Sequence, residues 1–356
     1  MSRAGLAWFF VVRIPETIPV FALETCWKTM GLALLKSSGE AAAWRDIAVA
    51  IPPGVRLESG ETLSAPEVTL RVFGDQSRPA VVALGGISAD RKVATIGDAN
   101  GWWDAIAGPS RAIDTDAYCV IGLDFLPGGD EQARTITSAD QARILGIALD
   151  AIDIARLHAF VGASYGGMVG LAFAARYPER LNSLCVISAS DRPHPAATAL
   201  RGIQRRILAF ASDCGRPEDG VSLARQLAMT TYRSPEEFAE RFNSAPGPAA
   251  GDPYDICNYL ISRGEAYDMS PARFVTLSDS IDRHRVDANL VRTKTLLISN
   301  VQDRLTPPAD MRRLQVALGG PAALVEIDSI YGHDAFLKEQ DAIGRPIKSF
   351  LEENDQ

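Results

Sequence analysis

The stretch HAFVGASYGGMVGLAFAARY, residues 158–177, carries the clearest structural signal of the chain. Its first five residues form a strand-like run, and the residues from Met168 onward have the character of a helix that stops at Pro178. Between them lies GASYG, residues 162–166, a G-x-S-x-G turn. A serine on such a sharp strand-to-helix turn stands at a helix N-terminus, where backbone N–H groups favour developing negative charge. We predict that Ser164 is a catalytic nucleophile; the alternative is an incidental serine in a Gly-rich turn.

Strands and helices alternate on both sides of this turn. The expected strands are Val68 to Phe73, Ala80 to Leu84, Tyr118 to Phe125, His158 to Gly162, Leu184 to Ser188, Thr295 to Ser299 and Leu324 to Ile327. A helix is expected over Ser138 to Ile154, with its apolar residues on one face. Such alternation implies a mostly parallel central sheet with helices on both faces. Together with the serine turn, it predicts an α/β-hydrolase fold.

The segment 193–287 interrupts this alternation. It has helical stretches and a loose segment SAPGPAAGDP, residues 244–253, but no buried strand pattern. We predict an inserted helical lid over the carboxyl edge of the sheet, where α/β proteins bind ligands. The hydrolase core would then comprise residues 46–192 and 288–356. Residues 1–45 are expected to be an N-terminal extension, loose at its start.

The fold presents its triad in the chain order serine, acid, histidine. Of the four histidines, only His333 follows the last strands; His158 precedes the serine, and His194 and His284 lie elsewhere. We therefore predict that His333 is the general base. Asp303 follows the strand before it and is the expected acid, which holds the imidazole in the right tautomer. Asp310 is the weaker candidate, and the alternative role of Asp303 is a turn or helix cap before Pro307.

A serine nucleophile also needs an oxyanion hole with two backbone donors. The amide of Tyr165, the residue after the nucleophile, should be one of them. The other should come from the loop LGGIS, residues 84–88, after an apolar strand. Within that loop the donor is Gly86 or Ile87, and the sequence does not separate the two.

Composition excludes several classes of function. The net charge of −8 is spread along the 356 residues, without a basic cluster for nucleic acid. The five cysteines, Cys26, Cys119, Cys185, Cys214 and Cys257, lack metal-ligand spacing, so we expect no metal and buried free thiols in a reducing compartment. The apolar run LAWFFVV, residues 6–12, is short for a signal sequence and lacks a small-residue cleavage site. We expect a cytoplasmic protein without a membrane segment.

The chain resembles the homoserine O-acyltransferase family of methionine biosynthesis, whose members have an α/β-hydrolase fold. The resemblance spans most of the chain from residue 57 on. It is carried by LESGETL (57–63), NGWWDAIAGPSRAIDTDAY (100–118), ASYGGMVGLAFAARYPERL (163–181), TTYRSPEEFAERF (230–242) and VEIDSIYGHDAFL (325–337). The segment 100–118 is the most specific match.

The resemblance implies a ping-pong reaction in which Ser164 takes an acyl group from acyl-CoA and passes it to the hydroxyl of L-homoserine. It implies that Tyr232 and Arg233 help to hold homoserine and that Asp334 contacts its amino group. Without the resemblance, Tyr232 and Arg233 would be a pair on a helix surface and Asp334 a helix cap. No permanently bound cofactor is implied, and a homodimer is expected.

The chain departs from the family pattern in three places. Tyr165 stands where most relatives have methionine, a Gly/Ser-rich stretch is reduced to LPGGDEQARTITS (126–138), and the lid is short. Three alternatives therefore stay open: a serine O-acyltransferase of the same family, a serine hydrolase that uses the same triad on water, and a non-catalytic binding protein. The complete triad argues against the last of these.

The identity of the acyl donor depends on one loop. Succinyl-specific members of the family tend to have an arginine two residues after the catalytic aspartate, and Leu305 occupies that position here. The adjacent residue, however, is Arg304, and a loop offset by one residue would bring it to the acyl pocket. A buried carboxylate needs such a cation. We favour succinyl-CoA over acetyl-CoA, with Arg304 as the partner of the succinyl carboxylate; the alternative is a solvated loop arginine.

Overall fold

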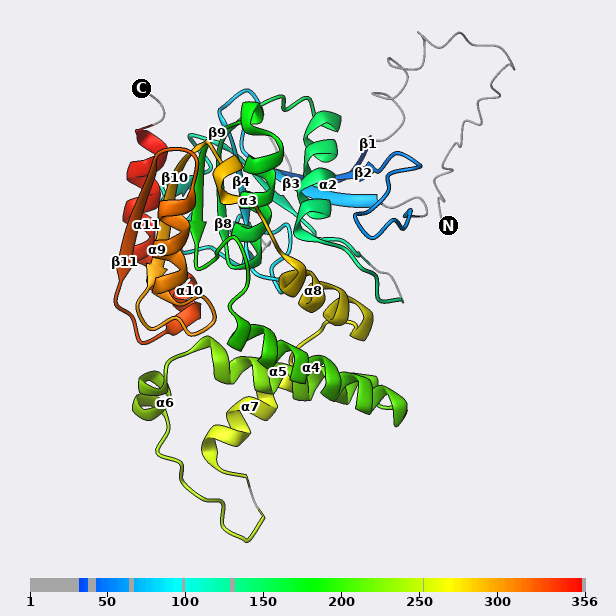
Figure 1. Ribbon diagram of the computed structural model, residues 1–356, viewed down its shortest axis with the longest axis vertical. Coiled ribbons are helices and arrows are strands. Elements are labelled where there is room, and N and C mark those ends of the chain that lie inside the picture. Colours follow the sequence, from blue (N-terminus) through cyan, green and yellow to red (C-terminus); the bar gives the residue numbers. More distant parts are fainter. Residues whose placement is uncertain are drawn as a thin grey trace, which may run out of the picture.

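A nine-stranded sheet forms the centre of the computed structural model, which describes residues 32–37, 43–63, 67–97, 100–128, 132–251 and 253–353 (Figure 1). The strand order is β1-β2-β3-β7-β4-β8-β9-β10-β11. The bounds are β1 Leu32–Ser37, β2 Trp44–Ala50, β3 Glu67–Phe73, β4 Ala80–Leu84, β7 Cys119–Leu123, β8 Leu157–Ala163, β9 Leu181–Ile187, β10 Lys294–Asn300 and β11 Ala322–Ile327. Two short strands, β5 (Ala107–Gly108) and β6 (Ile113–Asp114), pair separately.

The strands from β7 to β11 in this order are all parallel, and β1, β2 and β3 join them through antiparallel pairs. The carboxyl ends of β8 and β10 therefore lie at the same edge of the sheet. Because β8 leads into the serine turn and β10 into the aspartate loop, the topology places both side chains at one edge.

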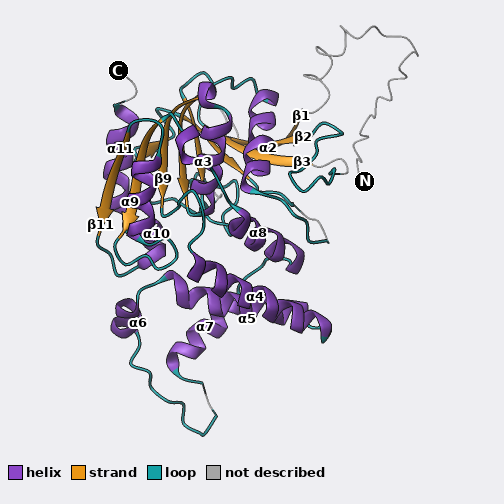
Figure 2. Cartoon of the chain, in the orientation of Figure 1, coloured by secondary structure: helices purple, strands orange, loops and turns teal. Residues whose placement is uncertain are grey.

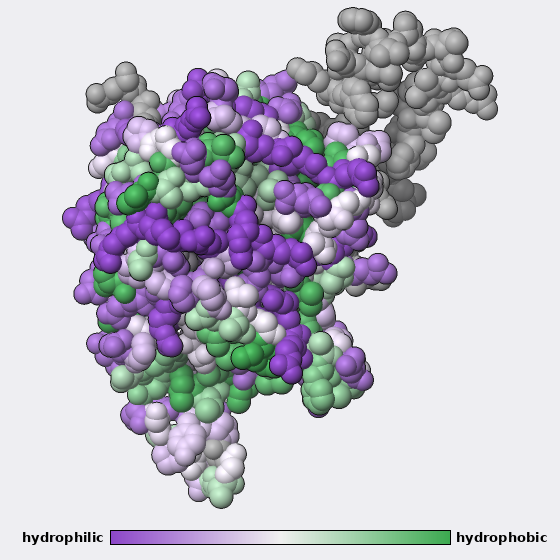
Figure 3. Space-filling view, viewed as in Figure 1, coloured by the Kyte–Doolittle hydropathy of each residue, from purple (hydrophilic) through white to green (hydrophobic). Residues whose placement is uncertain are grey.

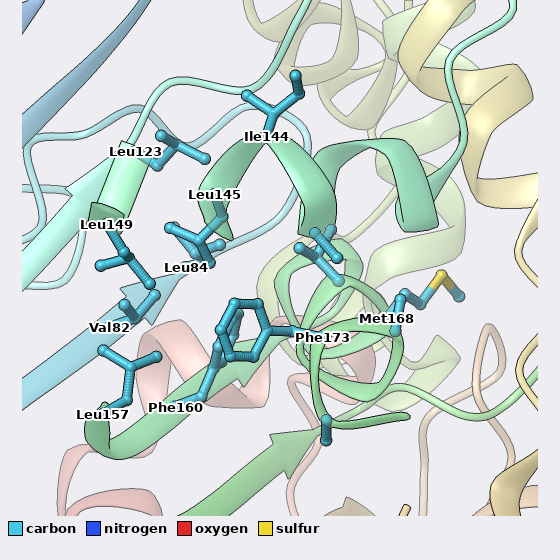
Figure 4. Close-up of a cluster of buried hydrophobic side chains, with 14 of the residues drawn as sticks. Val82, Leu84, Leu123, Ile144, Leu145, Leu149, Leu157, Phe160, Met168 and Phe173 are labelled. Atoms are coloured by element: carbon cyan, nitrogen blue, oxygen red, sulfur yellow. The ribbon is translucent and has the colours of Figure 1, made fainter. Parts of the chain in front are cut away.

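Two apolar cores cover the faces of the sheet. In β4, Val82 and Leu84 face the core formed with helices α2 (Ser138–Ala151) and α3 (Tyr165–Arg176), where Leu145, Leu149 and Phe173 are fully buried (Figure 4). Val81 and Ala83 face the opposite core, which includes the helix α11 (Gln340–Glu352). Both faces of a central strand are thus buried, which explains its continuous apolar sequence.

The remaining helices divide between the core and an inserted helical region. Helices α9 (Pro308–Ala317) and α10 (Ala335–Lys338) and the 3₁₀ turns Pro178–Arg180, Ala288–Leu290 and Gly332–Asp334 belong to the sheet-bearing part. Between β9 and β10 lie α4 (Pro195–Asp213), α5 (Pro217–Tyr232), α6 (Pro235–Arg241), α7 (Asp255–Glu265) and α8 (Pro271–Arg283). Figure 1 and Figure 2 show α4 to α7 below the edge where the strand arrows end. The expected helical insertion is therefore present over the carboxyl edge of the sheet.

The predicted α/β-hydrolase fold is confirmed, and each predicted strand is found within a few residues of its expected bounds. The sheet starts earlier than expected, however. β1 and the first residues of β2 lie inside the expected extension 1–45, of which residues 1–31 and 38–42 are outside the described part of the chain. The sequence WRDIAVA of β2 contains two charged residues, which hid the strand. The buried Asp46 accepts hydrogen bonds from Arg71 at 2.6 and 2.8 Å and from Arg91 at 3.0 Å. Buried charges are tolerated when they are paired in this way.

The cysteines follow the expectation in part. Cys119 in β7 and Cys185 in β9 are buried free thiols, and burial raises the pKa of the Cys119 thiol to about 11. Cys214 is exposed at the end of α4 and Cys257 is half-buried, so the expected burial is wrong for these two, while Cys26 lies outside the described residues. Among the helices of the described part, none combines the length and apolarity that crossing a membrane requires.

Candidate active site

The turn after β8 holds Ser164 in a strained backbone conformation, with φ 53° and ψ −120°. Such a conformation costs on the order of 1–3 kcal/mol and must be held by its surroundings. The Ser164 N–H donates to the Ile187 carbonyl at 2.8 Å, and the Gly166 N–H donates to the Gly85 carbonyl at 2.8 Å. A side chain at Gly166 would clash with the Leu84 backbone, and one at Gly162 would clash with the backbone of Gly166. The glycines of the motif are therefore required by close packing of this turn.

Ser164, His333 and Asp303 form one hydrogen-bonded array. The Ser164 Oγ lies 2.8 Å from His333 Nε2, and His333 Nδ1 lies 2.8 Å from Asp303 Oδ2. The second carboxylate oxygen, Oδ1, accepts the backbone N–H groups of Leu305 and Thr306, each at 2.9 Å. These bonds fix the Asp303 carboxylate so that Oδ2 points at the imidazole. The three residues expected to form the triad are thus brought together.

Asn300, the last residue of β10, holds the loop that carries His333. Its Nδ2 donates to the carbonyls of Ser329 at 2.8 Å and Gly332 at 2.7 Å, and its Oδ1 accepts the Ser329 N–H at 2.9 Å. Asn300 is 1% exposed. Asn300 was not among the residues predicted from the sequence. The signal available in the sequence was a polar residue at the end of a buried strand, before the segment that carries the predicted base.

The other candidates have structural partners. His158 is buried in β8 with its Nε2 3.2 Å from the Leu351 carbonyl, and His194 is the N-cap of α4. His284 bonds to Ser138 Oγ through Nδ1 at 2.6 Å, and burial lowers its pKa to about 4. Asp310 lies in the first turn of α9, 3.5 Å from Arg313. None of the four takes part in the array around Ser164.

The pKa of His333 lies above its ordinary value of 6.5. Burial lowers it, but the Asp303 carboxylate raises it by its charge and by its hydrogen bond, and Asp334 raises it further. The charge of Arg201 acts in the opposite direction. The imidazole is therefore held by carboxylates that stabilise its charged form, as a general base that must accept a proton requires.

The expected oxyanion donors border the same space. Within the described residues, the backbone N–H of Tyr165 has no hydrogen-bond acceptor, and Gly86 lies beside Ser164, so that a Cβ on it would stand 4.0 Å from the serine Oγ. Gly86 and Ile87 both line the cavity in front of Ser164. The Tyr165 side chain is buried, and its hydroxyl lies 2.5 Å from Ser280 Oγ of α8. The tyrosine thereby ties the start of α3 to the helical insertion.

A cavity of about 460 Å³ lies over Ser164 and His333. Both the sheet-bearing part and the inserted helices line it. From the core come the loop after β4, the start of α3, the loop after β10 and the segment 333–338; from the insertion come residues of α4, α5, α7 and α8. Its volume is in the range of small-molecule sites. The cavity is where a substrate can reach the serine.

Tyr232 and Asp334 line this cavity, as expected of residues that contact a substrate. The Tyr232 ring centroid is 6.2 Å from that of His333. Arg233 also borders the cavity but is 6% exposed, and its guanidinium already bonds Glu237 and, at 3.4 Å, Asp334. Two carboxylates thus balance the charge of Arg233, and its bond to Asp334 helps to position that carboxylate. That Arg233 also helps to hold homoserine stays a prediction.

Arg225 lines the cavity and was not predicted from the sequence. It lies on α5 seven residues before Tyr232, two helical turns away on the same face. Its guanidinium lies over the rings of Tyr267 at 4.4 Å and Tyr232 at 5.3 Å, and Nη1 is 3.4 Å from the Tyr232 hydroxyl. No described carboxylate forms an ion pair with it. The sequence signal for Arg225 was its spacing: residues seven positions apart lie on the same face of a helix, and Tyr232 was already a predicted site residue.

The two residues expected to set acyl specificity, Arg304 and Leu305, differ in whether they line the cavity. Leu305 lines the cavity, whereas Arg304 is exposed and is not among the lining residues. Asp303 sets the path of this loop, because its Oδ1 accepts the N–H groups of Leu305 and Thr306. The expectation that Arg304 meets the acyl group is therefore wrong for this conformation, and its alternative role, a solvated loop arginine, fits.

Known proteins are similar to this chain in sequence and in fold. The chain matches the family model described as the alpha/beta hydrolase fold over residues 79–340. It is 40% identical over 312 residues to a homoserine O-succinyltransferase of Xanthomonas campestris pv. campestris, with 84% of this chain and 85% of that protein covered. It is 30% identical over 352 residues to a homoserine O-acetyltransferase of Symbiobacterium thermophilum, with 83% and 91% covered. The solved structure of homoserine O-acetyltransferase from Bacillus anthracis superposes with a TM-score of 0.79 at 18% identity, over 86% of this chain and 97% of that one.

Proposed function

The chain belongs to the homoserine O-acyltransferase family within the α/β-hydrolase superfamily, and we propose that it transfers a succinyl group from succinyl-CoA to the hydroxyl of L-homoserine. The observation that carries the proposal is the hydrogen-bonded array of Ser164, His333 and Asp303 under a cavity lined by both arginine and carboxylate groups. A nucleophile, a base and opposite charges for an amino acid are the parts that acyl transfer to homoserine requires.

In the first half-reaction, the Ser164 Oγ attacks the thioester carbonyl carbon while His333 Nε2 takes the hydroxyl proton. The carbonyl oxygen becomes negative, and the Tyr165 N–H with that of Gly86 or Ile87 would donate to it. The C–S bond then breaks, and the CoA sulfur leaves as a thiol with the proton from His333. The product is an acyl-Ser164 ester, and Asp303 stabilises the imidazolium that forms in between.

In the second half-reaction, homoserine replaces CoA. Its hydroxyl gives its proton to His333 Nε2 and attacks the ester carbonyl carbon, and the Ser164 Oγ leaves with that proton. Water in place of homoserine would give hydrolysis by the same steps. The helical insertion over the cavity limits the access of water to the acyl-enzyme, which favours transfer.

Homoserine is an α-amino acid, so its carboxylate and ammonium groups need opposite charges close to each other. Asp334 suits the ammonium group, as expected from the sequence. Arg225, which no described carboxylate neutralises, suits the carboxylate, and Tyr232 lies between it and His333. We assign the carboxylate to Arg225 in place of Arg233.

The decisive experiment is an acyl-CoA assay with and without acceptor. CoA release should require homoserine beyond the first turnover, and mass spectrometry should detect an acyl adduct on Ser164. Initial rates should give parallel double-reciprocal lines. Equal turnover without acceptor would identify a hydrolase, and a preference for serine would identify a serine O-acyltransferase. Intersecting lines without an adduct would refute the covalent mechanism.

The expected homodimer also belongs to this proposal. α4 and α5 expose Ile203, Phe210 and Leu223, which are 47%, 73% and 50% exposed and line a surface hollow. Figure 3 shows apolar side chains gathered over this part of the molecule. Exposed apolar clusters of this kind mark protein interfaces. Light scattering should give twice the chain mass, and Phe210→Glu should shift it toward one chain; a wild-type monomer at assay concentration would contradict the dimer.

The cytoplasmic location expected from the sequence is a further part of the proposal. The free thiols of Cys119 and Cys185 are in keeping with a reducing compartment.

A further inference from the structure

A succinyl group differs from an acetyl group by a second carboxylate. Placing that carboxylate away from water without a cation is costly, so a succinyl-specific site must offer one. Within the described residues, the cations that line the cavity are Arg201, Arg225, Arg233, Arg263 and Lys338. Arg304, the cation expected from the sequence, is absent from this lining.

Four of these cations are poorly suited to the acyl group. Arg233 is matched by Glu237 and Asp334, and Arg225 lies between Tyr232 and Tyr267 on the side assigned to homoserine. Arg263 and Lys338 are exposed, and solvent screens their charge. Arg201 remains.

Arg201 belongs to a partly buried cluster of three charges between α4 and α8. Its Nε and Nη2 donate to Asp282 Oδ1 at 2.8 and 2.6 Å, and the other oxygen, Oδ2, lies 2.7 Å from Arg205 Nη1. The side chains of Arg201 and Asp282 are 12% and 8% exposed. Because two guanidinium groups share one carboxylate, the cluster carries an uncompensated positive charge in a shielded place.

The unused donors of Arg201 are available to the cavity. Its Nη1 makes no hydrogen bond to any described residue, while the Arg201 side chain lines the cavity. The neighbouring lining residues Leu200 and Ile281 are apolar and suit the two methylene groups of a succinyl chain. Burial and the Arg201 charge both lower the pKa of His333, against the effect of Asp303, so the Arg201 charge acts within range of the triad.

We propose that Arg201 binds the distal carboxylate of the succinyl group, both in the bound donor and in the acyl-Ser164 ester, and so selects succinyl-CoA over acetyl-CoA. The inference rests on the proposed function and adds a specificity residue to it. Asp282 holds the Arg201 guanidinium in place, and Arg205 binds the other oxygen of the same carboxylate. A preorganised guanidinium loses little entropy when a carboxylate binds.

The test compares Arg201→Met with Arg283→Met, a matched control. Arg283 is on α8 beside Asp282, is exposed, and does not line the cavity. In Arg201→Met, kcat/KM for succinyl-CoA should fall roughly 100-fold and that for acetyl-CoA less than about threefold. The KM for homoserine should be unchanged. Arg283→Met should leave both donors as in the wild type.

Each other outcome has a distinct meaning. An equal loss with both donors, or a rise in the homoserine KM with the donor preference unchanged, would overturn the role of Arg201. So would a wild-type preference for acetyl-CoA. Wild-type protein that consumes neither donor with homoserine or serine would refute the proposed function itself. If Arg201→Met does not fold, Arg201→Lys serves instead. Lysine keeps the positive charge but cannot bind a carboxylate through two parallel N–H groups. This variant should therefore also lose succinyl activity selectively, to a smaller extent.

Discussion

Replacing Asp303 by asparagine tests the catalytic geometry most sharply, because the surrounding bonds dictate how the new side chain must turn. Asp303 Oδ1 accepts two backbone N–H groups, from Leu305 and Thr306, and Oδ2 accepts from His333 Nδ1. In Asp303→Asn, the amide oxygen must accept the two backbone N–H groups, because an amide nitrogen in that place would be a donor opposite two other donors. The amide nitrogen then faces His333 Nδ1.

That arrangement forces the wrong tautomer on the imidazole. His333 Nδ1 would accept from the asparagine, so the ring proton would move to Nε2, which lies 2.8 Å from the Ser164 Oγ. A protonated Nε2 cannot take the serine proton. We expect kcat to fall about 10⁴-fold, equivalent to about 5.4 kcal/mol of transition-state stabilisation, because the base is disabled while the fold is kept.

The assay is CoA release at saturating donor and homoserine, with circular dichroism and thermal unfolding to show that the variant is folded. Asp310→Asn is the matched control, because within the described residues the Asp310 side chain pairs only with Arg313 on α9, at 3.5 Å. We expect it to keep its activity within about twofold, as a surface pair contributes little. A silent Asp303→Asn together with a damaging Asp310→Asn would refute the assignment of the acid.

Three further changes follow from the same site. Ser164→Ala should lower kcat by about 10⁶ at an unchanged unfolding midpoint, and near-normal turnover would reject the nucleophile. The base must be neutral to accept a proton, so the raised pKa of His333 should place the acidic limb of the kcat/KM profile above pH 6.5. Asp334 raises that pKa, so Asp334→Asn should move the limb to lower pH; a shift to higher pH would contradict this. Gly166→Ala should lower the free energy of unfolding by about 3 kcal/mol in urea titrations, because its Cβ meets the Leu84 backbone; wild-type stability would show that the turn can relax.

The structure differs from the sequence-based expectations mainly where side chains are long or charges are buried. The β2 strand was missed because Asp46 interrupts its apolar pattern, and only the partners Arg71 and Arg91, distant in the sequence, make that burial tolerable. Asn300 was missed for a related reason: its role depends on carbonyl groups of a loop about thirty residues later. Neither contact has a local pattern that reveals it.

The sequence by itself determined the fold class, the helical insertion and the positions of Ser164, His333 and Asp303. These features follow from local chemistry: apolar runs, a turn that only glycines permit, and parallel strands whose carboxyl ends meet at one edge. Tertiary structure alone decided which arginines line the cavity and which of them are already paired with carboxylates. Arg233 and Arg304 had the expected residue type, but a long flexible side chain points wherever its partners hold it. The carboxylates of Glu237 and Asp334 occupy Arg233, and the closed loop after Asp303 turns Arg304 to solvent. Packing of α4 and α5 over the cavity brings Arg201 and Arg225 into its lining, where no carboxylate pairs with Arg225 among the described residues.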